Sequence, residues 1–128
     1  MSLQFKKVHD GARNTSIQIT GSGFHEWTLV VDISKLVPVP REVRVDAVYY
    51  MLSDGLEVQL AWHAEEERLP FLPLAGRGRI DFSEVAGLHN NAEGKTGNLE
   101  LRAIPTGKLL EHAPIFTIVL DLSKHVGV

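Results

Sequence analysis

The sequence predicts an all-β domain with very little helix. Segments rich in Val, Ile, Leu and aromatic residues recur along the 128-residue chain, and Gly, Pro, Asn or Asp bounds each of them, as at the ends of strands. Short strands spaced roughly 10 to 15 residues apart, without a long helical period, are typical of a sandwich, jelly roll or barrel. Of these we predict a two-sheet antiparallel β-sandwich like a jelly roll.

Several segments carry the strand signal clearly, and two near the N-terminus carry it more weakly. The clear ones are Trp27–Ile33, Val43–Leu52, Leu56–Trp62, Arg77–Phe82, Asn98–Ile104 and Ile115–Leu122. The weaker ones are Leu3–Val8 and Ser16–Thr20. Ser-Asp-Gly at residues 53–55 is a tight-turn sequence between two clear segments, so it predicts a β-hairpin there.

Only two short stretches suit a helix. Asp32–Val37 ends before Pro38 and Ser83–Ala86 ends before Gly87, so neither exceeds about two turns. The first of these belongs to an internal similarity, since residues 27–37 and 116–126 agree at six of eleven positions. Asp and Ser bond the backbone at strand ends, so separate buried strands can converge on such sequences. The open alternative is that the two strands lie side by side in one sheet.

The chain length suits one domain. We predict an N-terminal arm over residues 1–14, which reaches a neighbouring subunit, and a single jelly-roll-like β domain over residues 15–128. The basic side chains of the arm are Lys6, Lys7 and Arg13. Against Asp10 alone they give a local charge of about +2, which suits an acidic partner surface. A simple edge strand or a frayed terminus is the open alternative for residues 2–14.

The composition gives no support for binding nucleic acid or a membrane. A formal charge of −3 provides no attraction to a phosphate backbone. No apolar run approaches the ~18 residues of a membrane span, and the N-terminus lacks the features of a signal peptide. The chain has no cysteine, so a disulfide or a thiolate metal site is not expected. We expect no cofactor, no metal, and synthesis in the cytoplasm of the producing cell.

No catalytic motif is complete in the sequence. Gly-Lys-Thr at residues 94–96 resembles part of a phosphate loop, but His89 stands where the first glycine belongs, and a strand-like pattern follows. Gly-Ser-Gly at residues 21–23 lacks the spacing of a nucleophile elbow. The histidines are scattered singly, without the spacing of a zinc motif. We therefore expect a protein that is not an enzyme.

The middle of the chain resembles a known family. The motifs are Arg-Ile-Asp-Phe-Ser-Glu at residues 79–84, Gly-Leu-His-Asn-Asn at residues 87–91 and Gly-Lys-Thr-Gly-Asn-Leu at residues 94–99. They are similar to a pattern in small tailed-phage proteins encoded beside the capsid gene, and Trp62 matches the Trp-containing strand of that pattern. The resemblance extends over residues 43–122, and the Asn-Asn to Gly-Lys-Thr-Gly loop is its most specific part. His89 and residues 65–67 depart from the pattern.

The resemblance implies a jelly-roll decoration protein, also called a cement or stapling protein, on the outer capsid surface of a virion. Such a bacteriophage protein binds across neighbouring subunits of the major capsid protein and stabilises their contacts. It implies self-association, with a homodimer favoured and a homotrimer as the alternative. The alternative function is a carbohydrate- or receptor-binding β module of a virion, and a small hydrolase is the least favoured.

Two groups of residues are candidates for these contacts and for an ordered loop. The interface candidates are Lys6, Lys7, Arg13, Tyr49 and Tyr50. The ordered-loop candidates are Asn90, Asn91, Gly94, Lys95, Thr96 and Gly97. Tyr49 and Tyr50 are adjacent in a strand and point to opposite sides, so one of them leaves the core and needs a cover. In the loop we expect Asn and Thr side chains to bond the backbone and glycines to adopt positive φ.

Two further expectations concern the aromatic residues and a run of glutamates. Large aromatic side chains in alternating strands are expected in the core. These are Trp27, Trp62, Phe71, Phe82 and Phe116. Glu-Glu-Glu-Arg at residues 65–68 is expected to form a solvated turn, with a docking patch for a basic surface as the alternative.

Overall fold

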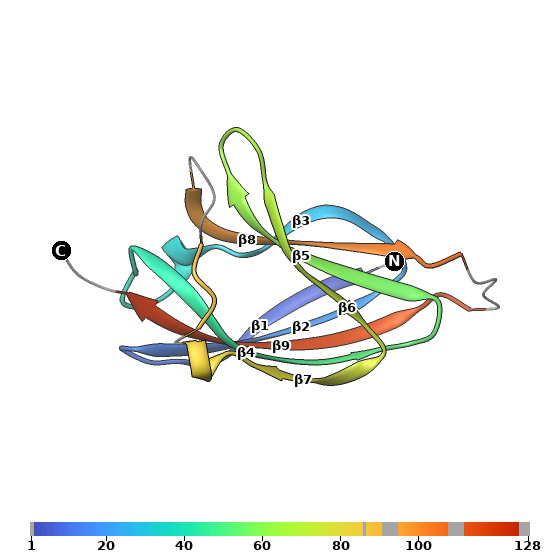
Figure 1. Ribbon diagram of the computed structural model, residues 1–128, viewed down its shortest axis with the longest axis horizontal. Coiled ribbons are helices and arrows are strands. Elements are labelled where there is room, and N and C mark those ends of the chain that lie inside the picture. The colour runs from blue at the N-terminus through green and yellow to red at the C-terminus, as the bar shows by residue number, and fades with distance from the viewer. Residues whose placement is uncertain (1, 86, 91–94, 108–111, 126–128) are drawn as a thin grey trace.

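The computed structural model describes residues 2–85, 87–90, 95–107 and 112–125. These residues form two β-sheets that pack face to face, together with two short 3₁₀ helices (Figure 1). The strands are β1 (Ser2–Asp10), β2 (Asn14–Ser22), β3 (His25–Val31), β4 (Glu42–Leu52), β5 (Leu56–Ala64), β6 (Leu69–Ala75), β7 (Arg77–Asp81), β8 (Lys95–Pro105) and β9 (Ile115–His125). The helices are η1 (Ile33–Lys35) and η2 (Ser83–Val85). The predicted all-β class is confirmed.

The strand order is that of a jelly roll with one strand added. The five-stranded sheet has the order β1-β2-β9-β4-β7, and the four-stranded sheet has the order β3-β8-β5-β6. The antiparallel pairs β2–β9, β3–β8, β4–β7 and β5–β6 are nested inside one another along the chain. This nesting is what results when one long hairpin wraps into two sheets, which is the jelly-roll arrangement. Strand β1 extends the five-stranded sheet beyond this set.

One prediction and one open alternative about neighbouring strands are wrong. Residues 53–55 do not close a hairpin, because β4 and β5 belong to different sheets and the turn carries the chain from one layer to the other. Leu52 and Leu56 on either side of the turn are both buried, so each strand supplies its own inner face to the shared core. The similar segments 27–37 and 116–126 do not lie side by side either, since β3 and β9 belong to opposite sheets.

Strand β6 has no counterpart among the predicted strands. It contains Pro70 and Pro73, which cannot donate a backbone hydrogen bond and therefore weaken a strand assignment from sequence. In the structure β6 is the outer strand of the four-stranded sheet and pairs only with β5. An edge strand has one side without a partner strand, so proline is tolerated there.

The core lies between the inner faces of the two sheets. Trp62 is only 1% exposed and stacks on Phe71 with 4.6 Å between ring centroids, and Phe116 is also buried. Phe71 and Phe82 are partly buried against this core. The expectation for Trp27 is wrong, because its ring lies beside two guanidinium groups and lines a pocket on the surface.

A buried ammonium group holds one end of the sandwich together. The side chain of Lys124, near the end of β9, is fully buried. Its Nζ donates to the Asp10 carboxylate, to the Gly11 carbonyl oxygen at 2.7 Å and to the Val37 carbonyl oxygen at 2.9 Å. The three donors of an ammonium group are thus all used. The contact joins the β1–β2 turn, the segment after η1 and the last strand.

The carboxylate of Asp46 on β4 is destabilised by the fold. Burial raises the pKa of Asp46, and the nearby carboxylates of Asp121 and Asp81 raise it too. The hydrogen bond from Ser123 Oγ, at 3.1 Å, acts in the opposite direction but does not offset them. The pKa of Asp46 is therefore raised from its ordinary value of 3.8.

We expect the substitution Asp46→Asn to stabilise the protein at neutral pH. The folded state holds the Asp46 proton more tightly than the unfolded chain, so the ionised group disfavours folding above the folded-state pKa. Asparagine removes the charge and keeps an oxygen that can accept from Ser123. In urea unfolding, the Asp46→Asn variant should have a higher midpoint than the wild type at pH 7. The two midpoints should be equal at a pH below the ordinary pKa of Asp. Glu65→Gln in the exposed turn after β5 is the control, and an equal gain there would contradict the explanation.

Candidate functional site

The open edge of the sandwich between β1 and β3 forms an apolar groove. We call this feature the edge groove, and its volume is about 200 Å³. Its apolar lining consists of Phe5, Ile17, Val30, Val31 and Leu36. The groove lies where β1 and β3, the outer strands of opposite sheets, meet η1 and the residue that follows it. Such a site can receive an apolar side chain of a partner.

Lysines surround the edge groove. Lys6, Lys7 and Lys35 line it together with Asp32, so its local charge is +2 (three lysines less one aspartate) on a chain with a net charge of −3. Lys7 Nζ donates to the Lys35 carbonyl oxygen at 3.1 Å, which ties β1 to η1. Hydrogen bonds from the Ser34 hydroxyl and backbone N–H lower the pKa of Asp32. The groove therefore favours an acidic partner surface.

Exposed apolar side chains continue along the same edge. Phe5 is 55% exposed, Val8 is 57% exposed and Val37 is 70% exposed. The Val37 N–H donates to the Asp10 carboxylate at 2.9 Å, so the segment after η1 lies against the end of β1. Single exposed apolar residues are ordinary, but several along one edge are typical of surfaces that bind partners.

The predicted N-terminal arm takes the form of a paired edge strand. Residues Ser2–Asp10 pair along their length with β2, with a bulge between Lys7 and His9. This is the edge-strand alternative for the segment, and its contact with a neighbouring subunit stays a prediction. Lys6 and Lys7 reach the edge groove, whereas Arg13 is exposed in the β1–β2 turn.

The two adjacent tyrosines have different environments. Tyr49 faces outward, is 36% exposed, and has the guanidinium of Arg79 5.1 Å from its ring centroid. Tyr50 packs against the core from the edge and covers Gly78, its partner on β7. A Cβ atom at Gly78 would lie only 3.0 Å from the Tyr50 hydroxyl. Tyr49 is thus the tyrosine available for contact with another subunit.

Tyr49→Glu and Tyr50→Glu should therefore affect different properties, association in the first case and folding stability in the second. Glutamate at position 49 finds Arg79 opposite it, so we expect the monomer to lose less than about 0.5 kcal/mol of stability while association weakens by more than about 1 kcal/mol. Glutamate at position 50 removes packing and places a charge against the core, so it should destabilise folding by about 2 kcal/mol. Urea unfolding and light scattering measure the two effects. If Tyr49→Glu leaves association unchanged, Tyr49 is not an interface anchor.

Leu88, between η2 and β8, is attached to β4. Leu88 forms a two-way backbone bridge with Val45 on β4, and Gly87 has φ +86°. Asn90 is only 5% exposed, and it interacts with at least one other group. Asn91 and Gly94 lie outside the described residues. The bridge therefore fixes Leu88 against β4.

The structure places Lys95, Thr96 and Gly97 at the start of β8 rather than in a loop. The Thr96 hydroxyl contacts His63 Nδ1 at 2.8 Å and accepts from the Asn98 N–H at 3.3 Å. Gly97 has φ +88°, and a Cβ atom there would lie 2.5 Å from Ile33 Cδ1. The second glycine of Gly-Lys-Thr-Gly is thus required by both backbone angle and close packing.

We expect Gly97→Ala to destabilise the fold by about 2 kcal/mol, from the cost of positive φ and from displacement of the buried Ile33 side chain. The matched control is Gly107→Ala. Gly107 has φ +95°, but none of the described residues lies within 4 Å of its Cβ position, so only the backbone cost remains. Thermal or urea unfolding of both variants separates the two effects, and equal losses would contradict the packing role of Gly97.

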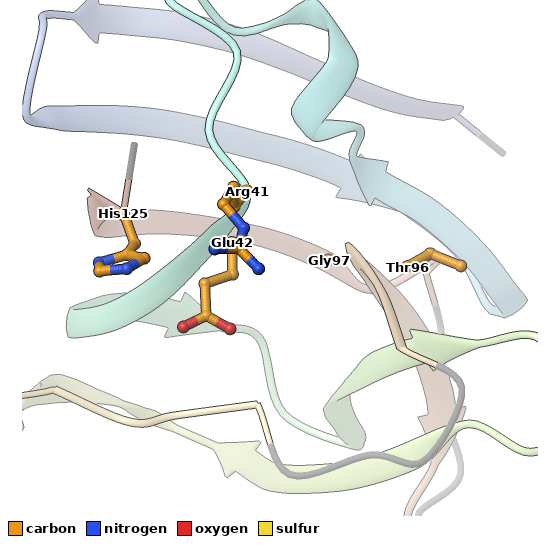
Figure 2. A pocket seen from close by; sticks show the side chains of 5 residues that line it. All are labelled: Arg41, Glu42, Thr96, Gly97 and His125. Carbon is orange, nitrogen blue, oxygen red and sulfur yellow. The ribbon is translucent and has the colours of Figure 1, made fainter. Parts of the chain in front are cut away.

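A polar pocket of about 350 Å³ lies where β4 and β8 begin and β9 ends, lined by Arg41, Glu42, Thr96, Gly97 and His125. Figure 2 shows Arg41 and Glu42 between His125 and Gly97, with the Thr96 side chain directed away from them. Arg41 and Glu42 each interact with at least one other group, so neither is without a partner. Their arrangement does not bring a nucleophile and a base together, so we assign no chemistry to this pocket.

Only part of the candidate site can be predicted from the sequence. Local charge selects Lys6 and Lys7 but does not identify Phe5, Lys35 or Leu36 as their neighbours. Phe5 between the polar residues Gln4 and Lys6 is an available signal. The contact of Lys7 with the Lys35 carbonyl oxygen cannot be read from the sequence, because it depends on the path of the chain between β1 and η1.

Comparisons with known proteins add no family to this description. No protein-family model matches the chain, and no curated protein matches it. Within residues 2–85, 87–90, 95–107 and 112–125, no group of three or more His, Asp or Glu could hold a metal ion. In the same part of the chain, no helix is long and apolar enough to cross a membrane.

Proposed function

We propose that this chain is a structural decoration protein of a tailed-phage head. It binds the outer surface of the icosahedral capsid, contacts neighbouring subunits of the major capsid protein and stabilises their association. It acts as a homodimer, with a homotrimer as the alternative, and it is made in the cytoplasm of the bacterial host. The proposal includes no catalytic role, no cofactor, and no binding of nucleic acid or membrane.

The edge groove is the observation that carries the proposal. It offers an apolar recess between two sheet edges, exposed Phe5 beside it, and a surplus of lysine on an acidic chain. An apolar centre with charged residues at its rim is the usual anatomy of a protein interface. The charges of Lys6 and Lys35 would attract an acidic shell surface, and the groove would receive an apolar side chain from it.

The mechanism is mass action on an assembled lattice. A protein that binds neighbouring capsid subunits in the shell, and not the separated subunits, stabilises the shell by its own binding free energy. A single contact of ordinary size is sufficient, because many copies repeat it over the particle. A rigid sandwich suits this task, since little conformational entropy is lost on binding.

Reconstitution with undecorated heads tests the proposal. Purified protein added to heads that lack it should sediment with them to a saturating ratio and raise the temperature at which they release DNA. The same heads with bovine serum albumin provide the control for nonspecific adsorption. Failure to bind undecorated heads of the producing phage at micromolar concentration would contradict the proposal.

A further inference from the structure

The outer face of the four-stranded sheet carries a second pocket, which we call the Trp27 pocket. Its volume is about 500 Å³, and it lies under the turn between β5 and β6. The side chains that define it are Trp27, His63, Arg68, Pro70, Glu100 and Arg102. They come from all four strands of the sheet and from the turn, so the site depends on the complete fold.

The polar side chains of the Trp27 pocket are held in place. Arg68 Nε donates to Glu100 Oε1 at 3.1 Å, and the Arg68 guanidinium lies 5.1 Å from the Trp27 ring centroid. The Arg102 guanidinium lies 4.9 Å from the same ring, and its Nη2 donates to Gln59 Oε1 at 2.6 Å. Arg68 therefore reaches from the turn, across β8, to β3. Preorganised groups lose little entropy when a ligand binds.

The floor of the site is buried and its polar groups are not all used. Ala61, opposite Glu100 in the sheet, is fully buried beneath these side chains. Glu100 is itself only 7% exposed. Among the described residues, Arg102 Nε is buried and has no hydrogen-bond partner. A buried donor without a partner costs free energy, and a ligand oxygen can relieve that cost.

The combination of groups selects the class of ligand. Guanidinium donors, a carboxylate acceptor and an indole edge together suit neighbouring hydroxyl groups on an apolar ring, which is the chemistry of a sugar. The volume suits a small molecule. Glu65, Glu66, Glu67 and Glu100 outnumber the two arginines, for a local charge of −2, which repels acidic sugars.

A cationic peptide is less well matched than a sugar. The acidic lining would attract it, but the positions over the Trp27 ring are already occupied by the chain's own guanidinium groups. A lysine or arginine of a partner would have to displace them to gain the same cation–π contact. A neutral hydroxyl ligand needs no such displacement.

We propose that the Trp27 pocket binds a neutral saccharide. Sugar hydroxyls donate to Glu100 and accept from Arg68 and Arg102, and the edge of the Trp27 indole supplies the apolar wall, because its ring face is covered by the two guanidinium groups. This site is separate from the edge groove, so it does not depend on the proposed binding to heads. On a phage head it would present a saccharide site on each decoration subunit.

The two tryptophans of the chain provide the test, because Trp27 lines the pocket and Trp62 is buried in the core. The probe is a panel of neutral mono- and disaccharides of glucose, galactose, mannose and N-acetylglucosamine, added to ¹⁵N-labelled protein. At least one sugar should shift the Trp27 indole N–H signal to saturation, with a Kd of about 1 mM or tighter. The Trp62 signal should not move. Glucuronic acid should bind more weakly than glucose.

Glu100→Gln should weaken sugar binding about tenfold, and Met51→Ala, on the outer face of the other sheet, should not change it. An unshifted Trp62 signal reports that each variant is folded. The proposal is overturned if no sugar in the panel moves the Trp27 signal at a sugar concentration of about 50 mM, which is 50-fold above a Kd of about 1 mM. It is equally overturned if trilysine moves that signal and the sugars do not, since the site then binds a cationic peptide.

Discussion

Replacing Lys124 with methionine should lower the free energy of unfolding by about 3 kcal/mol. Methionine keeps most of the side-chain volume, so the loss reports the ammonium group. Without it, the Asp10 carboxylate and the Gly11 and Val37 carbonyl oxygens lose a buried partner. Urea unfolding at pH 7 measures the difference. Lys6→Met, in an exposed position of β1, is the control and should change stability by less than about 0.5 kcal/mol.

The same contact should make the protein sensitive to acid. Burial acts to raise the pKa of Asp10, but hydrogen bonds from Lys124 and the Val37 N–H, with attraction from Lys124 and Lys7, outweigh it and lower the pKa. A lowered folded-state pKa stabilises the fold above the ordinary value of 3.8, and the contribution is lost as pH falls through the folded-state value.

The unfolding free energy of Lys124→Met should therefore be closest to that of the wild type at the lowest pH. Its deficit in unfolding free energy should be largest at neutral pH and shrink on acidification, because protonated Asp10 no longer needs the ammonium group. A constant deficit from pH 7 to acid would show that the hydrogen bonds to the carbonyl oxygens or the packing, and not the charge contact with Asp10, are responsible. An unchanged midpoint at pH 7 would contradict the role of the contact altogether.

The double substitution Phe5→Ser, Lys6→Glu should weaken binding to phage heads by about 100-fold. Phe5 is the exposed apolar residue at the edge groove, and Lys6 belongs to its basic rim. Both side chains are exposed, so the fold should persist, as a circular dichroism spectrum and an unchanged urea midpoint would show. Sedimentation with undecorated heads measures the affinity.

Arg77→Glu is the matched control for the charge reversal. Arg77 is an exposed basic residue on β7, the opposite edge of the five-stranded sheet. It should leave head binding near the wild-type level. Wild-type binding should also weaken as salt rises, because the lysine rim is exposed to solvent. If Arg77→Glu weakens binding as much as the double substitution, net charge and not the edge groove governs the contact.

Local pattern predicts the strands of this protein well and their arrangement poorly. Val43–Leu52 and Leu56–Trp62 were identified from apolar residues and turn signals, and β4 and β5 contain them. The same signals cannot tell whether the turn at residues 53–55 folds back within one sheet or crosses to the other. Strand β6 was missed because Pro70 and Pro73 weaken the signal that sequence provides.

The sites depend on contacts between residues far apart in the sequence, which is why they could not be predicted. Lys124 and Asp10 are 114 residues apart, and nothing beside either of them identifies the other. Trp27 was expected in the core as an apolar aromatic residue. Outside the core, its ring is covered by Arg102 from β8 and by Arg68 from the turn between β5 and β6. Such pairs appear only once the nested strand order is known.

The most direct test of the central claim is the composition of purified phage heads. Quantitative mass spectrometry of heads from the producing phage measures the ratio of this chain to the major capsid protein. We expect a fixed ratio that is the same in independent preparations and persists through density-gradient purification. Detection of the chain in infected cells together with its absence from purified heads would contradict the proposed function.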